Sequence, residues 1–204
     1  MKVAVVTPTI GNPKLVDCLA SVDKQTYQDI THYIFIDGKE HVSNVEEMLE
    51  GATKVKTVVL EENVGKGWYG HRVFAACSFL VNADIIVYLD EDNWFEPNHV
   101  ETMIDKIKSK DLMWSYSLRR ICDERGQYVL DDDCESLGRY PTFYDHLLNF
   151  VDTNCYCFRR EYLVTVAHHF YGQWGADRPF YKAASKLLPA FGCTGEATVN
   201  YTAP

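Results

Sequence analysis

The feature that most constrains the fold of this sequence is a series of short strand-like segments in its first 90 residues, each followed by a loop or helix signal. Residues 3–7 and 85–89 are continuous apolar runs, which are typical of strands covered on both faces. Residues 33–36 and 55–60 complete a set of four. Strands that alternate with helices predict an α/β fold, with a mostly parallel sheet and right-handed crossovers.

Helix signals lie between these segments. Asn12 is placed to act as an N-cap with Pro13 at the first helical position. Ser43 and Glu46 match a capping box that would open a second helix. A third helix is predicted near residues 68–81. These signals support three β-loop-α units before the fourth strand.

The pattern changes after residue 110. Residues 112–118 partly alternate between apolar and polar side chains, and the turn cluster 123–126 follows them, so an antiparallel hairpin is predicted. Residues 154–158 resemble one more strand, and residues 161–169 and 178–187 resemble helices. The second half is therefore expected to be mixed rather than parallel.

Composition narrows the class of protein. The chain has 204 residues, of which 47% are hydrophobic, so it should bury a core, and its length favours a single domain. The 20 Lys and Arg against 29 Asp and Glu give a net charge of −9, which disfavours nucleic acid as a partner. The sequence contains no apolar run long enough for a membrane span and no signal-peptide pattern, so we expect a cytoplasmic protein.

The seven cysteines are an odd number with irregular spacing and no CxxC pair. Reduced thiols are the expectation for an intracellular chain. Cys155 and Cys157 alternate along a strand-like stretch and would point to opposite faces.

Acidic residues end two of the expected strands. Asp37 closes the second strand, Asp90 closes the fourth, and Asp92 follows two residues later. Ligands of parallel sheets bind at the carboxyl ends of strands, and Mg²⁺ or Mn²⁺ takes one or two carboxylates beside a diphosphate. The alternative is that acidic residues are simply common in loops.

The loop at residues 63–67 precedes a helix and offers backbone N–H groups, Lys66 and a helix N-terminus, which together suit an anion. Arg72 lies about one turn into that helix and could reach a phosphate or a base carbonyl. A tight turn at the start of a helix would use the same glycines, and a solvated arginine would be ordinary.

Five ordered segments carry a resemblance: residues 5–9 (VVTPT), residues 19–27 (LASVDKQTY), Asp37-Gly38, Asn63-Val64-Gly65 and Asp90-Glu91-Asp92. Together they resemble the GT-A nucleotide-sugar glycosyltransferases of family 2. The compact chain is also similar to the N-terminal domain of chlorovirus-encoded multidomain glycosyltransferases.

The resemblance implies a single GT-A (Rossmann-like) domain over residues 1–204, and excision from a longer chain stays open. It has a mostly parallel central sheet with helices on both faces and a smaller antiparallel portion. Residues of about 1–110 would bind the nucleotide sugar and those of about 111–204 the acceptor. If the chain is viral, its place would be the host cytoplasm.

The resemblance also implies roles for individual residues. The nucleotide-sugar ligands would be Thr7, Pro8, Thr9, Asp37, Asn63, Lys66, Arg72, Asp90 and Glu91. Asp37 would accept from the uracil N3–H group. Asp92, with Asp90, would bind Mn²⁺ or Mg²⁺.

The catalytic base is expected among late acidic residues. Family members keep an acidic pair at a helix start, and here Ala176 replaces its first acid, which leaves Asp177 as the candidate. Asp152 is the rival. Trp94 and Trp174 flank these segments and could be platforms for a sugar ring, although core packing is the more common role of an indole.

The expected function is metal-dependent, inverting transfer of a sugar from a UDP-sugar, such as UDP-glucose or UDP-rhamnose, to a hydroxyl of a glycan acceptor. A carboxylate would take the acceptor proton while the metal offsets charge on the leaving diphosphate. A double displacement through a carboxylate nucleophile stays open.

Two alternatives come from other classes. A sugar nucleotidyltransferase would need a glycine-rich phosphate loop after the first strand, but residues 7–12 contain Gly11 alone. The acidic residues 131–135 suggest a non-catalytic carbohydrate- or cation-binding module, but they lack the spacing of a calcium loop.

Overall fold

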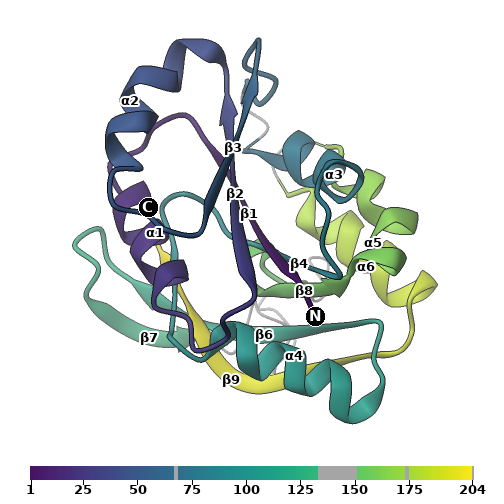
Figure 1. Cartoon of the computed structure of the whole chain (residues 1–204). Helices are drawn as coiled ribbons and strands as arrows, with labels where there is room; N and C mark the ends of the chain where they lie inside the picture. The colour runs from purple at the N-terminus through teal and green to yellow at the C-terminus, as the bar shows by residue number, and fades with distance from the viewer. Residues whose placement is uncertain (67–68, 133–150, 173–174, 204) are drawn as a thin grey trace.

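One mixed β-sheet runs through the whole chain in the computed structural model, which describes residues 1–66, 69–132, 151–172 and 175–203. Within those residues the sheet has nine strands in the order β3-β2-β1-β4-β8-β6-β9-β5, and β7 pairs with β6 (Figure 1). The strands are β1 (Val3–Thr9), β2 (Ile30–Asp37), β3 (Val55–Leu60), β4 (Ile85–Tyr88), β5 (Trp94–Phe95), β6 (Trp114–Cys122), β7 (Tyr128–Asp132), β8 (Tyr156–Arg159) and β9 (Phe191–Thr202).

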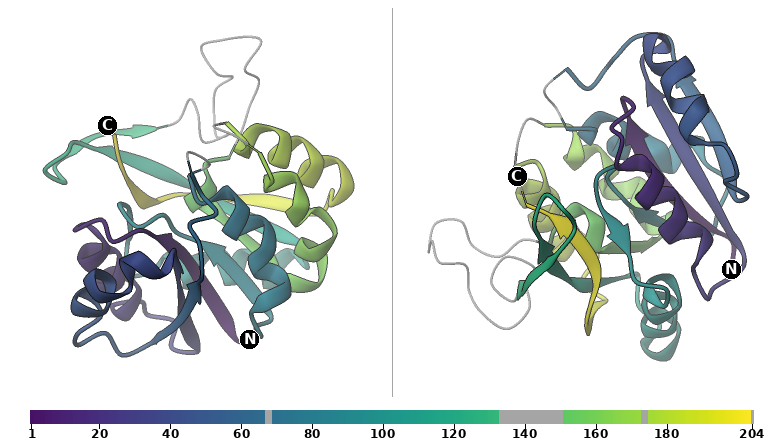
Figure 2. Two further views of the ribbon diagram at one scale, coloured as in Figure 1. Left: turned by 90° about the horizontal axis from the view of Figure 1, so that it is seen from above. Right: turned by 90° about the vertical axis from the view of Figure 1, so that its left-hand side faces the viewer.

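The sheet changes character halfway across. Strands β3, β2, β1 and β4 are parallel neighbours, as the βα repeats of the first half predict. Strand β8 then lies antiparallel between β4 and β6. Beyond it, β9 runs parallel to β6, while β5 and β7 are antiparallel to their neighbours. The predicted hairpin is confirmed as β6 and β7, and Figure 2 shows it reaching away from the rest of the sheet beside the end of β9.

Helices cover both faces of the sheet, as expected. The α-helices are α1 (Leu15–Asp23), α2 (Val42–Met48), α3 (His71–Leu80), α4 (His99–Lys110), α5 (Arg160–Val166) and α6 (Asp177–Leu187). Among the residues that the structure describes, the short 3₁₀ segments are η1 (Lys39–His41), η3 (Thr153–Cys155) and η4 (Ala167–Phe170). Helices α1 and α2 lie on one side, and α3, α5 and α6 lie together on the other (Figures 1 and 2). No helix of the described residues is long and apolar enough to cross a bilayer.

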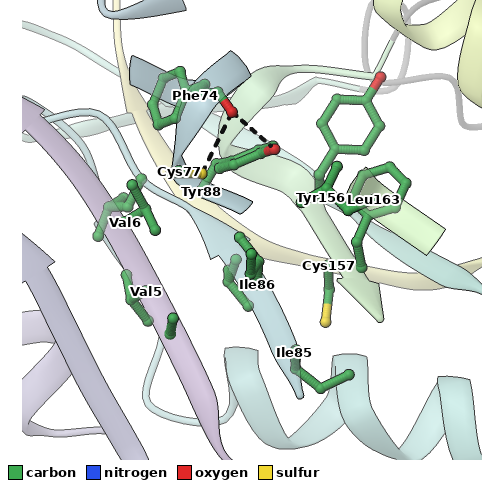
Figure 3. Packing of buried hydrophobic residues seen from close by; sticks show 14 of the residues in the cluster. Val5, Val6, Phe74, Cys77, Ile85, Ile86, Tyr88, Tyr156, Cys157 and Leu163 are labelled. Carbon is green, nitrogen blue, oxygen red and sulfur yellow. Dashed lines mark hydrogen bonds between the residues drawn. The ribbon is translucent and has the colours of Figure 1, made fainter. Parts of the chain in front are cut away.

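Aromatic packing fixes α3 on the sheet. Phe74 and Cys77 are buried, as their helical spacing predicts, and Figure 3 shows them beside Tyr88 of β4. The ring centroids of Phe74 and Tyr88 are 4.8 Å apart, and the Tyr88 hydroxyl donates to the Phe74 carbonyl oxygen over 3.4 Å. Phe170 of η4 meets the Tyr88 ring edge-on. These buried rings fix α3 and η4 against β4, the strand that leads to Asp90.

Two predicted helix starts differ from the structure. Helix α1 begins at Leu15, although Asn12 still caps the leading turn, because its Oδ1 accepts from the Lys14 N–H over 3.0 Å. The prediction of a capping box at Ser43 and Glu46 is wrong. The segment η1 comes first, so the N-cap position of α2 is His41 and Ser43 lies inside the helix.

The later elements hold further differences. Residues 154 and 155 were expected in a strand but lie in η3, because the Asp152 side chain accepts from the Asn154 N–H. Cys155 and Cys157 therefore do not alternate along one strand, and both are buried. The six described cysteines are free thiols, in line with the expectation. Strand β9 and helix α4 were not predicted.

Candidate active site

The carboxyl ends of β1, β2 and β4 lie side by side, since these strands are parallel neighbours in the order β2-β1-β4. The loops after them therefore meet at one edge of the sheet. This edge carries most of the residues that the sequence singles out. In its loop-holding part, Asp37 and Arg72 bind the loop after β3. Its acidic part contains the carboxyl groups of Asp90, Asp92, Asp152 and Asp177.

Asp37 holds the loop between β3 and α3. Its Oδ1 accepts from the Val64 N–H over 2.7 Å, and its Oδ2 accepts from the Gly65 N–H over 2.8 Å. A Cβ atom on Gly65 would lie 2.5 Å from Asp37 Oδ2, so only glycine allows this approach. Arg72 donates from Nη1 to the Val64 carbonyl oxygen over 2.9 Å. The predicted nucleotide residues Asp37 and Arg72 thus meet around one loop.

Asp37 is only 3% exposed, so the loop covers its carboxylate. Asn63 and Lys66 are closer to solvent, and the Asn63 Oδ1 accepts from the Lys66 N–H over 2.9 Å. The backbone of Lys66 has a φ of 21°, in the left-handed region. Of this predicted set, Lys66 is the exposed cation beside the loop.

The segment at the end of β1 places its three side chains differently. The Thr7 hydroxyl is buried and hydrogen-bonds to His32 Nε2 over 2.9 Å, so this side chain faces the interior and offers nothing to a nucleotide. Pro8 is buried next to Gly70, just before α3. Thr9 donates from Oγ1 to Glu91 over 2.5 Å. Alternation along β1 puts Thr7 and Thr9 on one face of the strand and Pro8 on the other.

Glu91 secures the loop between β1 and α1. Besides Thr9, its carboxylate accepts from the backbone N–H of Asn12 over 2.8 Å and of Ile10 over 3.4 Å. The middle acid of the Asp90-Glu91-Asp92 segment is thus engaged with the protein. Its role as a nucleotide ligand stays a prediction.

Asp90 is joined to the second half of the chain through Asn154. The Asp90 N–H donates to Asn154 Oδ1 over 2.6 Å, and the Asn154 amide donates to Asp90 Oδ2 over 2.9 Å. Burial, followed by repulsion from Asp92 and Asp152, raises the pKa of Asp90 well above its usual range.

Asp92 is held by the end of β9. Its carbonyl oxygen accepts from the Thr202 hydroxyl over 2.7 Å, and the Thr202 N–H donates to Asn93 Oδ1 over 2.8 Å. Burial is the first cause that raises the pKa of the Asp92 carboxyl, and the charges of Glu91 and Asp152 add to it. Sequence reasoning missed Thr202 because β9 itself carries no clear strand signal.

Asp152 lies in a buried ion pair. Its Oδ2 accepts from Arg119 Nη1 over 2.5 Å, and the Arg119 Nε donates to Asp132 over 2.8 Å. The Arg119 guanidinium also stands over the Tyr201 ring, 4.3 Å from its centroid. The guanidinium is therefore surrounded by partners from β7, β9 and the segment before η3. No sequence motif pointed to Arg119.

Asp177 is the first residue of α6, as its sequence context predicts. Its Oδ1 accepts from the Arg178 N–H over 2.9 Å, and its side chain is 17% exposed. Burial, with repulsion from Asp152, raises the pKa of Asp177 to about 6. Asp177 is therefore a carboxyl group that can exchange a proton near neutral pH.

The acidic part of the site suits a hard cation. Within the described residues, no three His, Cys, Asp or Glu side chains are grouped as ligands of one ion. Asp90 and Asp92 repel each other, and each has a raised pKa, so a cation between them would be favoured. Mg²⁺ or Mn²⁺ needs only one or two carboxylates when phosphate and water complete its shell. These two residues fit such an ion.

Trp94 lies in β5 beside this part of the site. It lines a groove of about 600 Å³ together with Asp92, Lys14 and Arg125. The second proposed platform, Trp174, lies outside the described residues. Asp131 and Asp132 of the acidic run belong to β7, and residues 133–135 also fall outside the description.

A comparison with protein-family models matches residues 4–167 to glycosyl transferase family 2. The chain belongs to this family. The expectation of a family 2 domain is therefore confirmed, and the match includes Asp37, Asp90, Asp92 and Asp152, while Asp177 lies beyond its end. A search of curated proteins finds no match.

Solved structures give the same fold for this family 2 chain. The crystal structure of S. aureus TarS 1–349 has a TM-score of 0.74 at 16% identity, covering 99% of this chain and 60% of that one. Its complex with UDP has a TM-score of 0.73 at 15% identity, covering 100% and 61%. Its complex with UDP-GlcNAc has a TM-score of 0.74 at 14% identity, covering 100% and 59%. The chain thus spans about 60% of the length of these neighbours. The structural likeness confirms the expected GT-A fold.

Proposed function

We propose that this chain is a metal-dependent, inverting glycosyltransferase domain that moves a sugar from a UDP-sugar to a hydroxyl of a glycan acceptor. The observation that carries the proposal is the group of interacting carboxylates at the sheet edge, Asp90, Asp92, Asp152 and Asp177. Membership of family 2 and the UDP and UDP-GlcNAc complexes of the TarS neighbours support the donor class.

The donor would lie over the loops after β1, β2 and β3. Asp90 and Asp92 would hold Mn²⁺ or Mg²⁺, which offsets negative charge on the leaving diphosphate. Lys66 stands beside this edge as a cation for the phosphates. Asp37 and Arg72 shape the 63–65 loop, so that in this arrangement they act on the nucleotide through the loop.

Asp177 serves as the general base in this proposal. Both oxygens of Asp152 accept hydrogen bonds, from Asn154 and from Arg119, so this carboxylate is already engaged within the protein. Asp177 is more exposed and its pKa of about 6 suits proton transfer near pH 7. The acceptor hydroxyl would give its proton to Asp177 as its oxygen bonds the anomeric carbon and the bond to UDP breaks, which inverts the configuration.

The test is a donor screen with a stereochemical readout. The full chain is incubated with UDP-sugars and glycan acceptors, with Mn²⁺ or with EDTA, and the product is examined by proton NMR. We expect metal-dependent release of UDP and an inverted anomeric centre. A product that retains configuration would reject the single-base mechanism, and equal turnover in EDTA would reject the metal.

A further inference from the structure

We propose that Asn154 is a positioning residue that fixes the Asp90 side chain and ties it to the buried ion pair of Asp152 and Arg119. Its effect on donor binding rests on the proposed function. Its effect on the Asp90 side chain does not, and can be observed without any donor.

Asn154 is fully buried and makes two hydrogen bonds with Asp90. Its Oδ1 accepts from the Asp90 backbone N–H over 2.6 Å, while its Nδ2 donates to the Asp90 carboxylate over 2.9 Å. The same Nδ2 donates to Asp152 Oδ1 over 2.8 Å. One planar amide therefore sets both the backbone and the side chain of Asp90, directly after the end of β4.

The far side of this bridge is rigid. Asp152 accepts from Arg119 Nη1 over 2.5 Å, and both side chains are less than a tenth exposed. Arg119 is held in turn by Asp132 and by the ring of Tyr201. Because β6, β7 and β9 all contribute, the acceptor half of the chain fixes the orientation of an acid in the donor half.

Only an amide can make this bridge. An aspartate at position 154 cannot donate, so it would place a third carboxylate against Asp90 and Asp152 and leave the Asp90 side chain without its donor. A serine could meet one partner but could not span both. The bridge thus depends on the chemistry of the residue as well as its volume.

Gln25 offers a matched control. It is also a buried amide, and it donates to the carbonyl oxygens of Ser21 and Glu96 and accepts from the Val100 N–H. Those partners are backbone groups and none is an acid of the site. Gln25→Glu therefore repeats the change from amide to carboxylate without touching Asp90.

The experiment compares crystal structures and UDP affinity for the wild-type chain, Asn154→Asp and Gln25→Glu. We expect the Asp90 carboxylate to leave its position only in Asn154→Asp. We also expect Mn²⁺-dependent UDP affinity, measured by calorimetry, to fall at least tenfold in Asn154→Asp and less than twofold in Gln25→Glu.

A double variant separates positioning from general damage. If Asn154 acts through Asp90, adding Asn154→Asp to Asp90→Asn should cause no further loss of UDP affinity, whereas additive losses would overturn the proposal. An unmoved Asp90 in the Asn154→Asp structure would overturn it as well. If that variant does not fold, Asn154→Ser takes its place with the same expectations. A wild-type chain that binds no UDP would refute the proposed function, and the crystal structures would still decide the position of Asp90.

Discussion

Individual carboxylates of the site have two different roles in this molecule. Asp37 and Glu91 accept backbone N–H groups and hold loops, while Asp92 and Asp177 keep raised pKa values and partial exposure. The difference follows from hydrogen bonding: two backbone N–H groups donate to each carboxylate of the first pair, whereas one donates to Asp177.

Asp177→Asn should lower kcat for sugar transfer by about 10² to 10⁴, because an amide cannot take the acceptor proton. UDP-sugar affinity should change little. In the wild-type chain, activity should be lost as the pH falls through about 6, where the base becomes protonated. Asp105→Asn, at an exposed position on α4, is the control. Loss of activity in Asp152→Asn with an active Asp177→Asn would exchange the two roles.

The raised pKa of Asp177 also predicts a stability change. Between its usual pKa and about 6 the folded chain binds the proton more tightly than the unfolded chain, so stability falls as the pH rises through this window. Asp177→Asn should therefore unfold at higher urea than the wild type at pH 7, by on the order of 2 kcal/mol in the free energy of unfolding. An equal or lower urea midpoint would show that ionised Asp177 does not destabilise the folded chain.

Asp92→Asn should abolish Mn²⁺-dependent turnover and leave the fold intact. Its backbone carbonyl still accepts from Thr202 after the change, so the loop keeps its anchor. Calorimetry with UDP, with and without Mn²⁺, and a thermal melt give the two readouts. A variant with wild-type activity in the presence of metal would remove Asp92 from the site.

The positions of these acids could be predicted from local sequence, but their partners could not. Asp37 and Asp90 follow apolar runs, which is a signal within a few residues. Glu91 bonds to a loop about 80 positions earlier in the chain, and Asn154 reaches Asp90 across 64 positions. Such contacts depend on strand order, which a single sequence does not show.

At the scale of elements, the loop between β3 and α3 is built around one close approach. Both oxygens of Asp37 receive N–H groups from this loop, and Gly65 leaves no room for a side chain. Local signals marked the loop as a possible anion site. They did not reveal that Asp37 of β2 holds it.

Gly65→Ala should therefore weaken both the fold and the donor site. Its Cβ would lie 2.5 Å from Asp37 Oδ2, so the loop must move and a buried carboxylate loses donors, at a cost of about 1–3 kcal/mol. UDP affinity should fall with it. Ser109→Ala, at an exposed position near the end of α4, is the control. Equal urea midpoints and equal UDP affinities from calorimetry for the two variants would contradict the prediction.

Elements with local signals were predicted well, and those that depend on distant pairing were not. The four parallel strands and the β6–β7 hairpin follow from apolar runs and turn residues. Strand β9 contains two glycines and is defined by its pairing with β6 and β5, so its own sequence does not predict a strand. It nevertheless supplies Tyr201 and Thr202 to the site.

At the scale of the whole molecule, two buried histidines tie the stability of the fold to pH. His32 lies in β2 and hydrogen-bonds Thr7 of β1, and His99 hydrogen-bonds Thr198 and stacks on Phe95. Burial lowers the pKa of each to about 3. One supports the parallel half of the sheet, and the other joins α4 to β9.

Acid should therefore destabilise the fold through both histidines. Each has a folded pKa below its unfolded value, so the unfolded chain gains protons first and stability is lost as the pH falls below about 6.5. Between pH 6.5 and 5 this amounts to about 2 kcal/mol for each histidine.

Asp177 changes the stability in the opposite sense over part of this pH range, so the test compares the pH dependence of variants with that of the wild type. His32→Gln should show a shallower loss of urea stability between pH 7 and 5 than the wild type, while the exposed His168→Gln should keep the wild-type slope. Parallel curves for His32→Gln and the wild type would mean that His32 is protonated in the folded chain.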